Sequence, residues 1–182
     1  MSKPSQVIVV VEDDHHKMLV YRYLIKHGLK AYAIRIERSP SGGGSAESWV
    51  RKRFVKEVSV YRSRHAKTAL IVIIDADTCA VQDRLRQLDQ ALKDGGKQTV
   101  AESEQIARLV PKRNIETWVL CLLNVQAVNE ETDYKRTRDD WNELIPPAAE
   151  MLFEWTRPKA ELPNHCIDSL RSGVRELNRL TF

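Results

Sequence analysis

Three acidic residues follow runs of apolar residues, and their spacing suits the binding of a cation. Glu12 follows the run VIVVV at 7–11, and Asp75 and Asp77 follow the run ALIVII at 69–74. Side chains two apart in an extended chain point the same way, so the two aspartates are expected close together. Neighbouring carboxylates repel unless a proton or cation lies between them, and such oxygens suit Mg²⁺ or Mn²⁺. Alternatively, Asp77 caps a following helix and Asp75 ends its strand in water.

The apolar runs before these acids predict strands that are buried on both faces of a parallel sheet. A helical segment over about 15–27, capped by Gly28, and a second strand over 30–36 complete a βαβ unit. The chain is therefore expected to have an α/β fold, with a doubly wound, mostly parallel sheet flanked by helices. Ligands of such sheets bind beyond the carboxyl ends of the strands, where the strand order reverses. This places Glu12 and the two aspartates at one edge of the sheet.

Helical spacing of apolar residues accounts for the middle of the chain. The segments 50–61 and 81–92 each carry an apolar stripe, and Gly95 and Gly96 end the second. The glycine-rich segment 39–45 is expected to be a flexible connector, because its spacing is not that of a phosphate-binding loop.

The later part of the chain is divided by a polar stretch that begins near residue 128. Before it, the segment 106–110 fits either a short strand or the end of a helix, and Asn114 is a suitable N-cap for an amphipathic helix over 115–123. We therefore expect an α/β domain over residues 1–127. A helical C-terminal extension over residues 128–182 is expected to pack on it.

Composition predicts a cytoplasmic protein with no membrane segment. The 182 residues contain no apolar run near the roughly 20 residues that span a bilayer, and the N-terminus lacks the features of a secretory signal. Three widely spaced cysteines without a CxxC pair favour reduced thiols over disulfides or structural zinc.

A basic stretch accompanies the acidic residues. The net charge is +4, and positive residues gather between 51 and 67, where Arg51, Arg53 and Lys56 are candidate contacts to nucleic acid. A basic surface around a small acidic centre would suit a metal-dependent enzyme that acts on phosphates. The alternative is an ordinary solvated helix face.

The arrangement of strands and acids resembles the Toprim superfamily, which includes topoisomerases, bacterial primases and overcoming-lysogenization-defect nucleases. In that family a glutamate ends the first strand and an Asp-x-Asp pair ends a later one. The resemblance covers residues 6–124. It implies that Glu12 is a general base or metal ligand, and that Asp75 and Asp77 are ligands of Mg²⁺ or Mn²⁺.

A second segment of the chain also resembles this family, whereas two positions near Glu12 differ from its usual pattern. The sequence PKRNIETWVL at 111–120 resembles small Toprim-like proteins of phage-defence type, which implies that Glu116 is a further metal ligand. The helix macrodipole alone would also favour an acid there, by about 0.3–1 kcal/mol. Where the family usually has a glycine and a second acid, this chain has Asp13 and His16. His16 is a candidate metal ligand or proton carrier, or else an exposed or capping residue.

Together these features predict metal-dependent hydrolysis of phosphodiesters in DNA or RNA. The cation would polarise the phosphate, and Glu12 would take the proton of the attacking water. Lys112 or Arg113 would neutralise the charge that develops on the phosphate. No tyrosine motif of a topoisomerase is recognisable, which favours hydrolysis over strand passage.

Two other classes of function stay open. One is a response-regulator receiver domain, in which Asp13 and Asp14 would bind Mg²⁺ and Asp75 would accept phosphate, although the turn and lysine expected of that family are missing. The other is a non-catalytic subunit that binds nucleic acid or protein. Small Toprim-like proteins often accompany a larger ATPase, so the resemblance also implies an ATPase partner in a phage-defence system. A homo-oligomer is compatible with the sequence as well.

Overall fold

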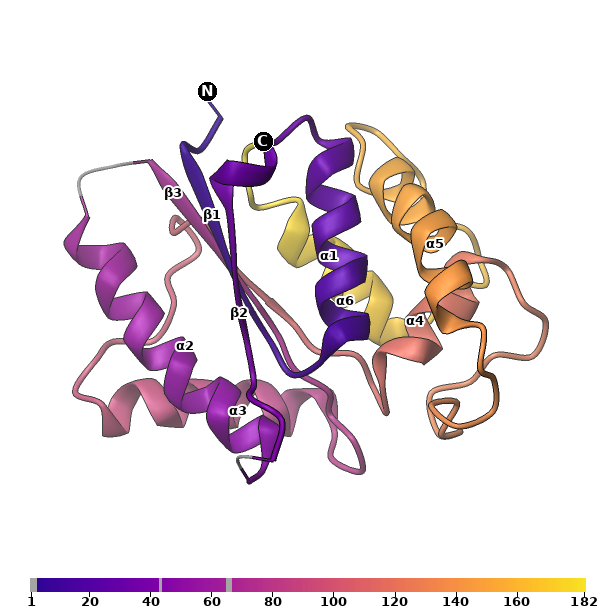
Figure 1. Cartoon of the computed structure of the whole chain (residues 1–182), viewed down its shortest axis with the longest axis horizontal. Helices are drawn as coiled ribbons and strands as arrows, with labels where there is room; N and C mark the ends of the chain where they lie inside the picture. Colours follow the sequence, from indigo (N-terminus) through magenta and orange to yellow (C-terminus); the bar gives the residue numbers. More distant parts are fainter. Residues whose placement is uncertain (1–2, 43, 65–66) are drawn as a thin grey trace.

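A four-stranded parallel sheet forms the centre of the molecule in a computed structural model, which describes residues 3–42, 44–64 and 67–182 (Figure 1). The strand order is β2-β1-β3-β4. The strands are β1 (Gln6–Val11), β2 (Ile34–Arg38), β3 (Thr68–Ile73) and β4 (Ile106–Leu109). All three pairings are parallel, which confirms the predicted fold class.

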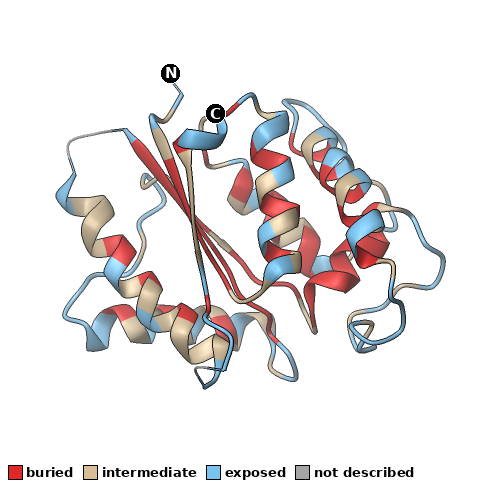
Figure 2. Cartoon of the chain, in the orientation of Figure 1, coloured by how far each residue is buried: buried red, intermediate tan, exposed pale blue. Residues whose placement is uncertain are grey.

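Helices cover both faces of this sheet. They are α1 (Asp14–Lys26), α2 (Ala46–Ser63), α3 (Val81–Asp94), α4 (Ile115–Leu122), α5 (Trp141–Trp155) and α6 (Asp168–Leu177). Figure 1 shows α2 and α3 on one face and α1, α4, α5 and α6 on the other. Alternate residues of β1 serve two separate cores, with Val9 in the core under α1 and Val10 in the core under α2 and α3. Burial of both faces explains the continuous apolar runs, and the central strands are red in Figure 2.

The order in which strands are added to the sheet reverses between β1 and β3. The chain adds β2 on one side of β1 and then returns to add β3 and β4 on the other. Val10 pairs with Val72 in a parallel register, so the residues just after the two strands emerge at the same edge. This is the reversal point at which doubly wound sheets bind ligands, and it lies at the lower edge of the sheet in Figure 1.

Several predicted boundaries and patterns differ from the observed ones. The second strand begins at Ile34, because residues 31–33 form a 3₁₀ turn instead of an extended chain. The ambiguous segment after residue 105 is strand β4. Helix α4 is buried on every side and not amphipathic, because α5 packs against it and Gly173 of α6 abuts its Trp118. The predicted glycine connector includes Gly43, which lies outside the described residues.

The C-terminal part of the chain shares a core with the sheet. Helix α5 packs on α1 and α4, and α6 packs against β4. Trp118, Trp141 and Trp155 are buried, and Trp118 Nε1 donates to Ser169 Oγ at 2.8 Å. Within the described ranges, none of the helices is long and apolar enough to cross a membrane.

Candidate functional site

Glu12 and Asp75 meet at the carboxyl edge of the sheet. Each residue follows a central strand, Glu12 after β1 and Asp75 after β3. The backbone N–H of Asp75 donates to Oε1 of Glu12 at 3.0 Å. The predicted convergence of these two acids from separate parts of the chain is therefore present in the structure.

His16 lies between two aspartates. Its Nε2 lies 2.9 Å from Oδ1 of Asp75, and the imidazole is fully buried. Its Nδ1 lies 3.0 Å from Oδ1 of Asp13, without the alignment of a hydrogen bond. Burial opposes the charge, but Asp75 and Asp13 outweigh it and hold the pKa of His16 well above its ordinary value. Both ring nitrogens of His16 thus face carboxylates in this conformation, and its role as a metal ligand stays a prediction.

Asp13 is the N-cap of helix α1, and its side chain also contacts Lys135 in the loop after α4. Its Oδ1 accepts the backbone N–H groups of His15 and His16, the usual N-cap arrangement. Its Oδ2 accepts a 3.0 Å hydrogen bond from Nζ of Lys135. Although burial acts in the opposite direction, the contact with His16 and the charge of Lys135 hold the pKa of Asp13 well below its usual range. Asp13 is therefore ionised at neutral pH.

Glu116 is a buried carboxylate in the first turn of α4. It is fully buried, and its Oε1 lies 2.6 Å from Nδ1 of His15. The hydrogen bond with Glu116 raises the pKa of His15 against the effect of burial. Oε2 of Glu116 has no hydrogen-bond partner within the part of the chain that the structure describes. A buried oxygen without a partner is costly unless a ligand completes it, which makes this oxygen a candidate for cation binding.

The acids of this edge act on one another through their charges. Burial and the charge of Asp75 raise the pKa of Glu12 to about 7. Burial also raises the pKa of Asp75, and the charges of Asp13 and Glu116 add to this effect. Lys135 faces the same group: burial opposes its charge, but Asp13, Asp75 and Glu116 raise its pKa. A divalent cation would relieve the repulsion by favouring the ionised carboxylates.

Contrary to the prediction, the extended chain does not continue through Asp77. Its φ is 53°, a left-handed conformation, so the extended chain ends before it and the expected alignment with Asp75 is wrong. The Asp75 side chain is buried against His16, whereas the Asp77 side chain is 61% exposed and lies 3.4 Å from Arg84. Asp77 still lies close enough for its charge to raise the pKa of Glu12.

Lys112 and Arg113 contact the segment that follows Asp75, near the acidic edge. Nζ of Lys112 donates to the carbonyl oxygen of Cys79 at 2.9 Å. Arg113 pairs with Asp77 through an isolated antiparallel bridge, and its guanidinium lies 3.9 Å from the carboxylate of Asp133. Both cations thus have structural partners in this conformation, and their predicted contact with phosphate stays a prediction.

The three predicted nucleic-acid contacts lie on α2. Arg51 forms an ion pair with Glu47 at 2.6 Å, and Arg53 lies 2.7 Å from Glu37. Lys56 is exposed to solvent. The positive charges of the two arginines are therefore partly neutralised locally, and only Lys56 presents its charge to solvent in the way the prediction requires.

The donors at this edge fit a cation that prefers oxygen. Glu12, Asp75, Asp77 and Glu116 supply carboxylates, and the unpartnered Oε2 of Glu116 marks a buried oxygen that a ligand would satisfy. As they stand, no three acidic, histidine or cysteine side chains of residues 3–42, 44–64 and 67–182 are grouped closely enough to hold an ion. Binding would therefore require these carboxylates to approach one another more closely than they do here.

The sequence contains no clear indication that two positively charged side chains, those of Lys135 and Arg84, belong to the site. Lys135 lies 122 residues after Asp13, in a polar stretch that reads as an ordinary loop. Arg84 sits on the predicted apolar helix, yet it is buried, and its Nε donates to the carbonyl oxygen of Asp75 at 2.9 Å. Asp13 directly before a helix does carry a signal, because aspartate is a favoured N-cap.

Comparisons with known proteins returned no match for this chain among protein-family models, curated proteins or solved structures.

Proposed function

We propose that this protein hydrolyses phosphodiester bonds of nucleic acid in a reaction that depends on Mg²⁺ or Mn²⁺. The observation that carries the proposal is the meeting of Glu12 and Asp75 at the reversal point of the sheet, with the Asp75 N–H 3.0 Å from Glu12 Oε1. Buried Glu116 adds a third carboxylate, whose charge acts on Asp75. The resemblance to Toprim nucleases predicts the same chemistry from the same residues.

Each side chain of the site has a role in this proposal. Asp75 and Glu116 would hold the cation, with the exposed Asp77 at the solvent side. The cation would polarise the scissile phosphate and stabilise the charge of the transition state. Glu12 would accept the proton of the attacking water as the new P–O bond forms and the ester P–O bond breaks. Its raised pKa, about 7, suits a base that works near neutral pH.

The remaining residues keep these groups in place. His16 donates to Asp75 and so orients the carboxylate, as hydrogen-bond partners of metal ligands commonly do. Lys135 is charged and bound to Asp13, which places a cation beside the acids where a phosphate would approach. Arg84 holds the backbone of Asp75 through its carbonyl oxygen.

The test is cleavage of labelled single- and double-stranded DNA and RNA with Mg²⁺, with Mn²⁺ and with EDTA. The expected result is cleavage only with a divalent ion, and loss of at least about 100-fold in rate for Asp75→Asn, since the carboxylate acts in the transition state. Asp83→Asn, which changes a half-buried acid in the first turn of α3, outside the acidic site, is the matched control. Equal cleavage by the parent and Asp75→Asn, or cleavage in EDTA, would refute the proposal.

A second measurement separates an enzyme from a subunit that only binds nucleic acid. Binding without cleavage under every metal condition would favour the binding subunit. If α2 contributes to binding, Lys56→Ala should weaken binding to all sequences alike and lower the salt dependence by about one phosphate contact. Lys30→Ala, which removes an exposed lysine outside α2, directly before the turn that leads into β2, is the control.

A further inference from the structure

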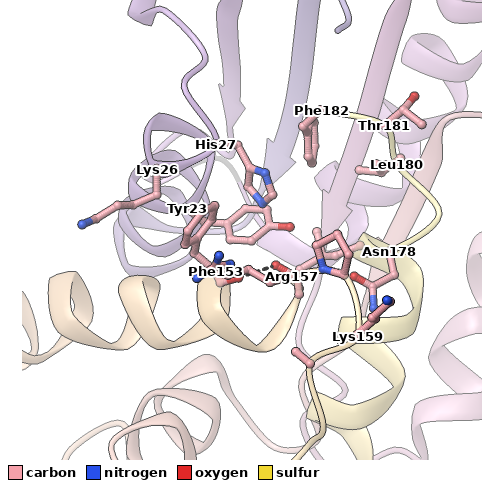
Figure 3. A pocket seen from close by; sticks show the side chains of 14 residues that line it. Tyr23, Lys26, His27, Phe153, Arg157, Lys159, Asn178, Leu180, Thr181 and Phe182 are labelled. Carbon is pink, nitrogen blue, oxygen red and sulfur yellow. Dashed lines mark hydrogen bonds between the residues drawn. The ribbon is translucent and has the colours of Figure 1, made fainter. Parts of the chain in front are cut away.

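A pocket of about 800 Å³ lies at the end of the molecule opposite the acidic edge (Figure 3). It is formed by the last turns of α1, α5 and α6 together with the final residues of the chain. Its size falls within the range of about 300–1,000 Å³ that is typical of small-molecule sites. Among the described residues, none of the contacts of the acidic site involves a residue that lines this pocket.

One wall of the pocket is a cluster of aromatic rings around His27. The ring centroid of His27 lies 4.6 Å from Tyr23, 4.8 Å from Phe153 and 4.9 Å from Phe182. Figure 3 shows the His27 and Phe182 rings side by side. Such a cluster offers flat surfaces and ring edges to a planar aromatic ligand.

His27 also presents a polar atom that needs a partner. Its Nε2 is buried and has no hydrogen-bond partner among the described residues. Burial and the charge of Lys3 lower the pKa of His27 to about 4, so the imidazole is neutral at physiological pH. A neutral imidazole has one donor and one acceptor nitrogen, and a heterocycle with polar edges could satisfy the unpaired one.

The pocket is also lined by positively charged side chains. Lys26, Arg157 and Lys159 are among its 14 lining residues, which include no aspartate or glutamate. Arg157 pairs with Glu154 at 3.1 Å, and Lys26 pairs with Glu150 at 2.8 Å. Lys159 forms no ion pair within the described ranges. Figure 3 places Arg157, Lys159 and Asn178 across from the His27 and Phe182 rings.

From this arrangement we infer that the pocket binds a nucleotide, with the base against the rings of His27 and Phe182 and the phosphates at Arg157 and Lys159. The aromatic wall and the cationic side are both needed for such a ligand, and a simple anion or an apolar molecule would use only one of them. Stacking of a base on an aromatic ring contributes about 1–3 kcal/mol, and arginine binds phosphate through paired N–H donors.

The pocket and the acidic site share one helix. His15 and His16 lie in the first turn of α1, and Tyr23 and His27 lie at its other end. The 12 steps from His15 to His27 correspond to about 18 Å along a helix. Binding at this pocket is therefore spatially separate from the proposed catalysis, and either proposal can fail without the other.

The experiment is calorimetric titration of the full chain with AMP, ADP and ATP in EDTA, which prevents binding through a divalent ion at the acidic edge. Adenosine, inorganic pyrophosphate and dodecanoate are titrated separately, as a base without phosphate, a phosphate without base and an apolar anion. We expect at least one of the nucleotides to bind more tightly than all three partial ligands. Tighter binding of dodecanoate or pyrophosphate than of every nucleotide would overturn the proposal, as would the absence of nucleotide binding at millimolar concentration.

Matched variants locate the binding site. Arg157→Ala should weaken nucleotide binding about tenfold. Arg86→Ala should not, because Arg86 is on α3 and does not line the pocket. It is a matched control, since both arginines pair with an acid three residues earlier. Phe182→Ala should also weaken binding about tenfold, whereas Tyr32→Ala removes a ring that is 89% exposed and outside the pocket. Binding that is the same in Arg157→Ala and Phe182→Ala as in their controls would contradict this location. Circular dichroism checks that each variant is folded.

Discussion

The backbone N–H of Asp75 donates a 3.0 Å hydrogen bond to Oε1 of Glu12, which lies 63 residues earlier in the chain. This contact joins the ends of the two central strands at the point where the strand order reverses. It also places one carboxylate next to another in a partly buried position, and the pKa of Glu12 rises to about 7 as a result of burial and the charge of Asp75.

The first prediction concerns Glu12→Gln in EDTA. Between pH 4.5 and about 7, folded Glu12 keeps a proton that the unfolded chain has released. The free energy of unfolding of the parent should therefore fall as the pH rises through this window, by up to about 3 kcal/mol. Glutamine does not titrate but can still accept the Asp75 N–H, so Glu12→Gln should be more stable than the parent at pH 8 and similar at pH 4.5.

Urea unfolding of both proteins at several pH values measures this effect. Addition of Mg²⁺ at pH 8 should remove the advantage of Glu12→Gln, because a cation would stabilise ionised Glu12 in the parent only. The same pH dependence in both proteins would mean that Glu12 does not titrate in this window.

The second prediction concerns His16→Ala. The imidazole is fully buried between Asp13 and Asp75, and its loss would leave the Asp75 carboxylate buried without its charged partner. Removal of one partner of a buried ion pair costs about 3–5 kcal/mol, so we expect a loss of about this size in the free energy of unfolding at pH 7. His165→Ala, at an exposed position, should change it little. Equal stabilities of the two variants would show that Asp75 does not depend on His16.

The third prediction separates the two interpretations of Glu116. If its buried Oε2 binds the cation, Glu116→Gln should weaken Mn²⁺ binding by at least about tenfold, as measured by electron paramagnetic resonance. Glu143→Gln, which changes an acid in the first turn of α5, is the control for the effect of the helix macrodipole. Unchanged Mn²⁺ affinity in Glu116→Gln would show that Glu116 does not bind the cation.

The fourth prediction tests the packing of α6 on α4. A Cβ at Gly173 would lie 2.2 Å from Cη2 of the fully buried Trp118. Alanine normally stabilises a helix relative to glycine by about 0.5–1 kcal/mol, but overpacking at this contact should instead destabilise the protein by about 1–3 kcal/mol. The measurement is the thermal unfolding of Gly173→Ala, with Ser172→Ala as the control. A Gly173→Ala protein that is more stable than the parent would show that Trp118 moves freely away from the contact.

Local pattern was sufficient to predict most of the fold. Strands β1 and β3 are apolar at nearly every position because both faces are buried, so their sequences differ plainly from those of loops and surface helices. The N-cap at Asn114 and the end of α3 at Gly95 also follow from local backbone chemistry. The complete burial of α4 was not predictable, because it depends on α5 and α6, which come later in the chain.

The sequence by itself determined that Glu12 and Asp75 share one edge of the sheet, because parallel strands bring their carboxyl ends together. Only the tertiary structure decided the state of these acids. The positive φ of Asp77 turns it out of the strand direction, and the approach of Lys135 depends on the path of a long loop. The pKa of His16 is raised because two aspartates surround it. Strand burial is a property of a short segment, whereas the charge balance of a buried site depends on every segment that reaches it.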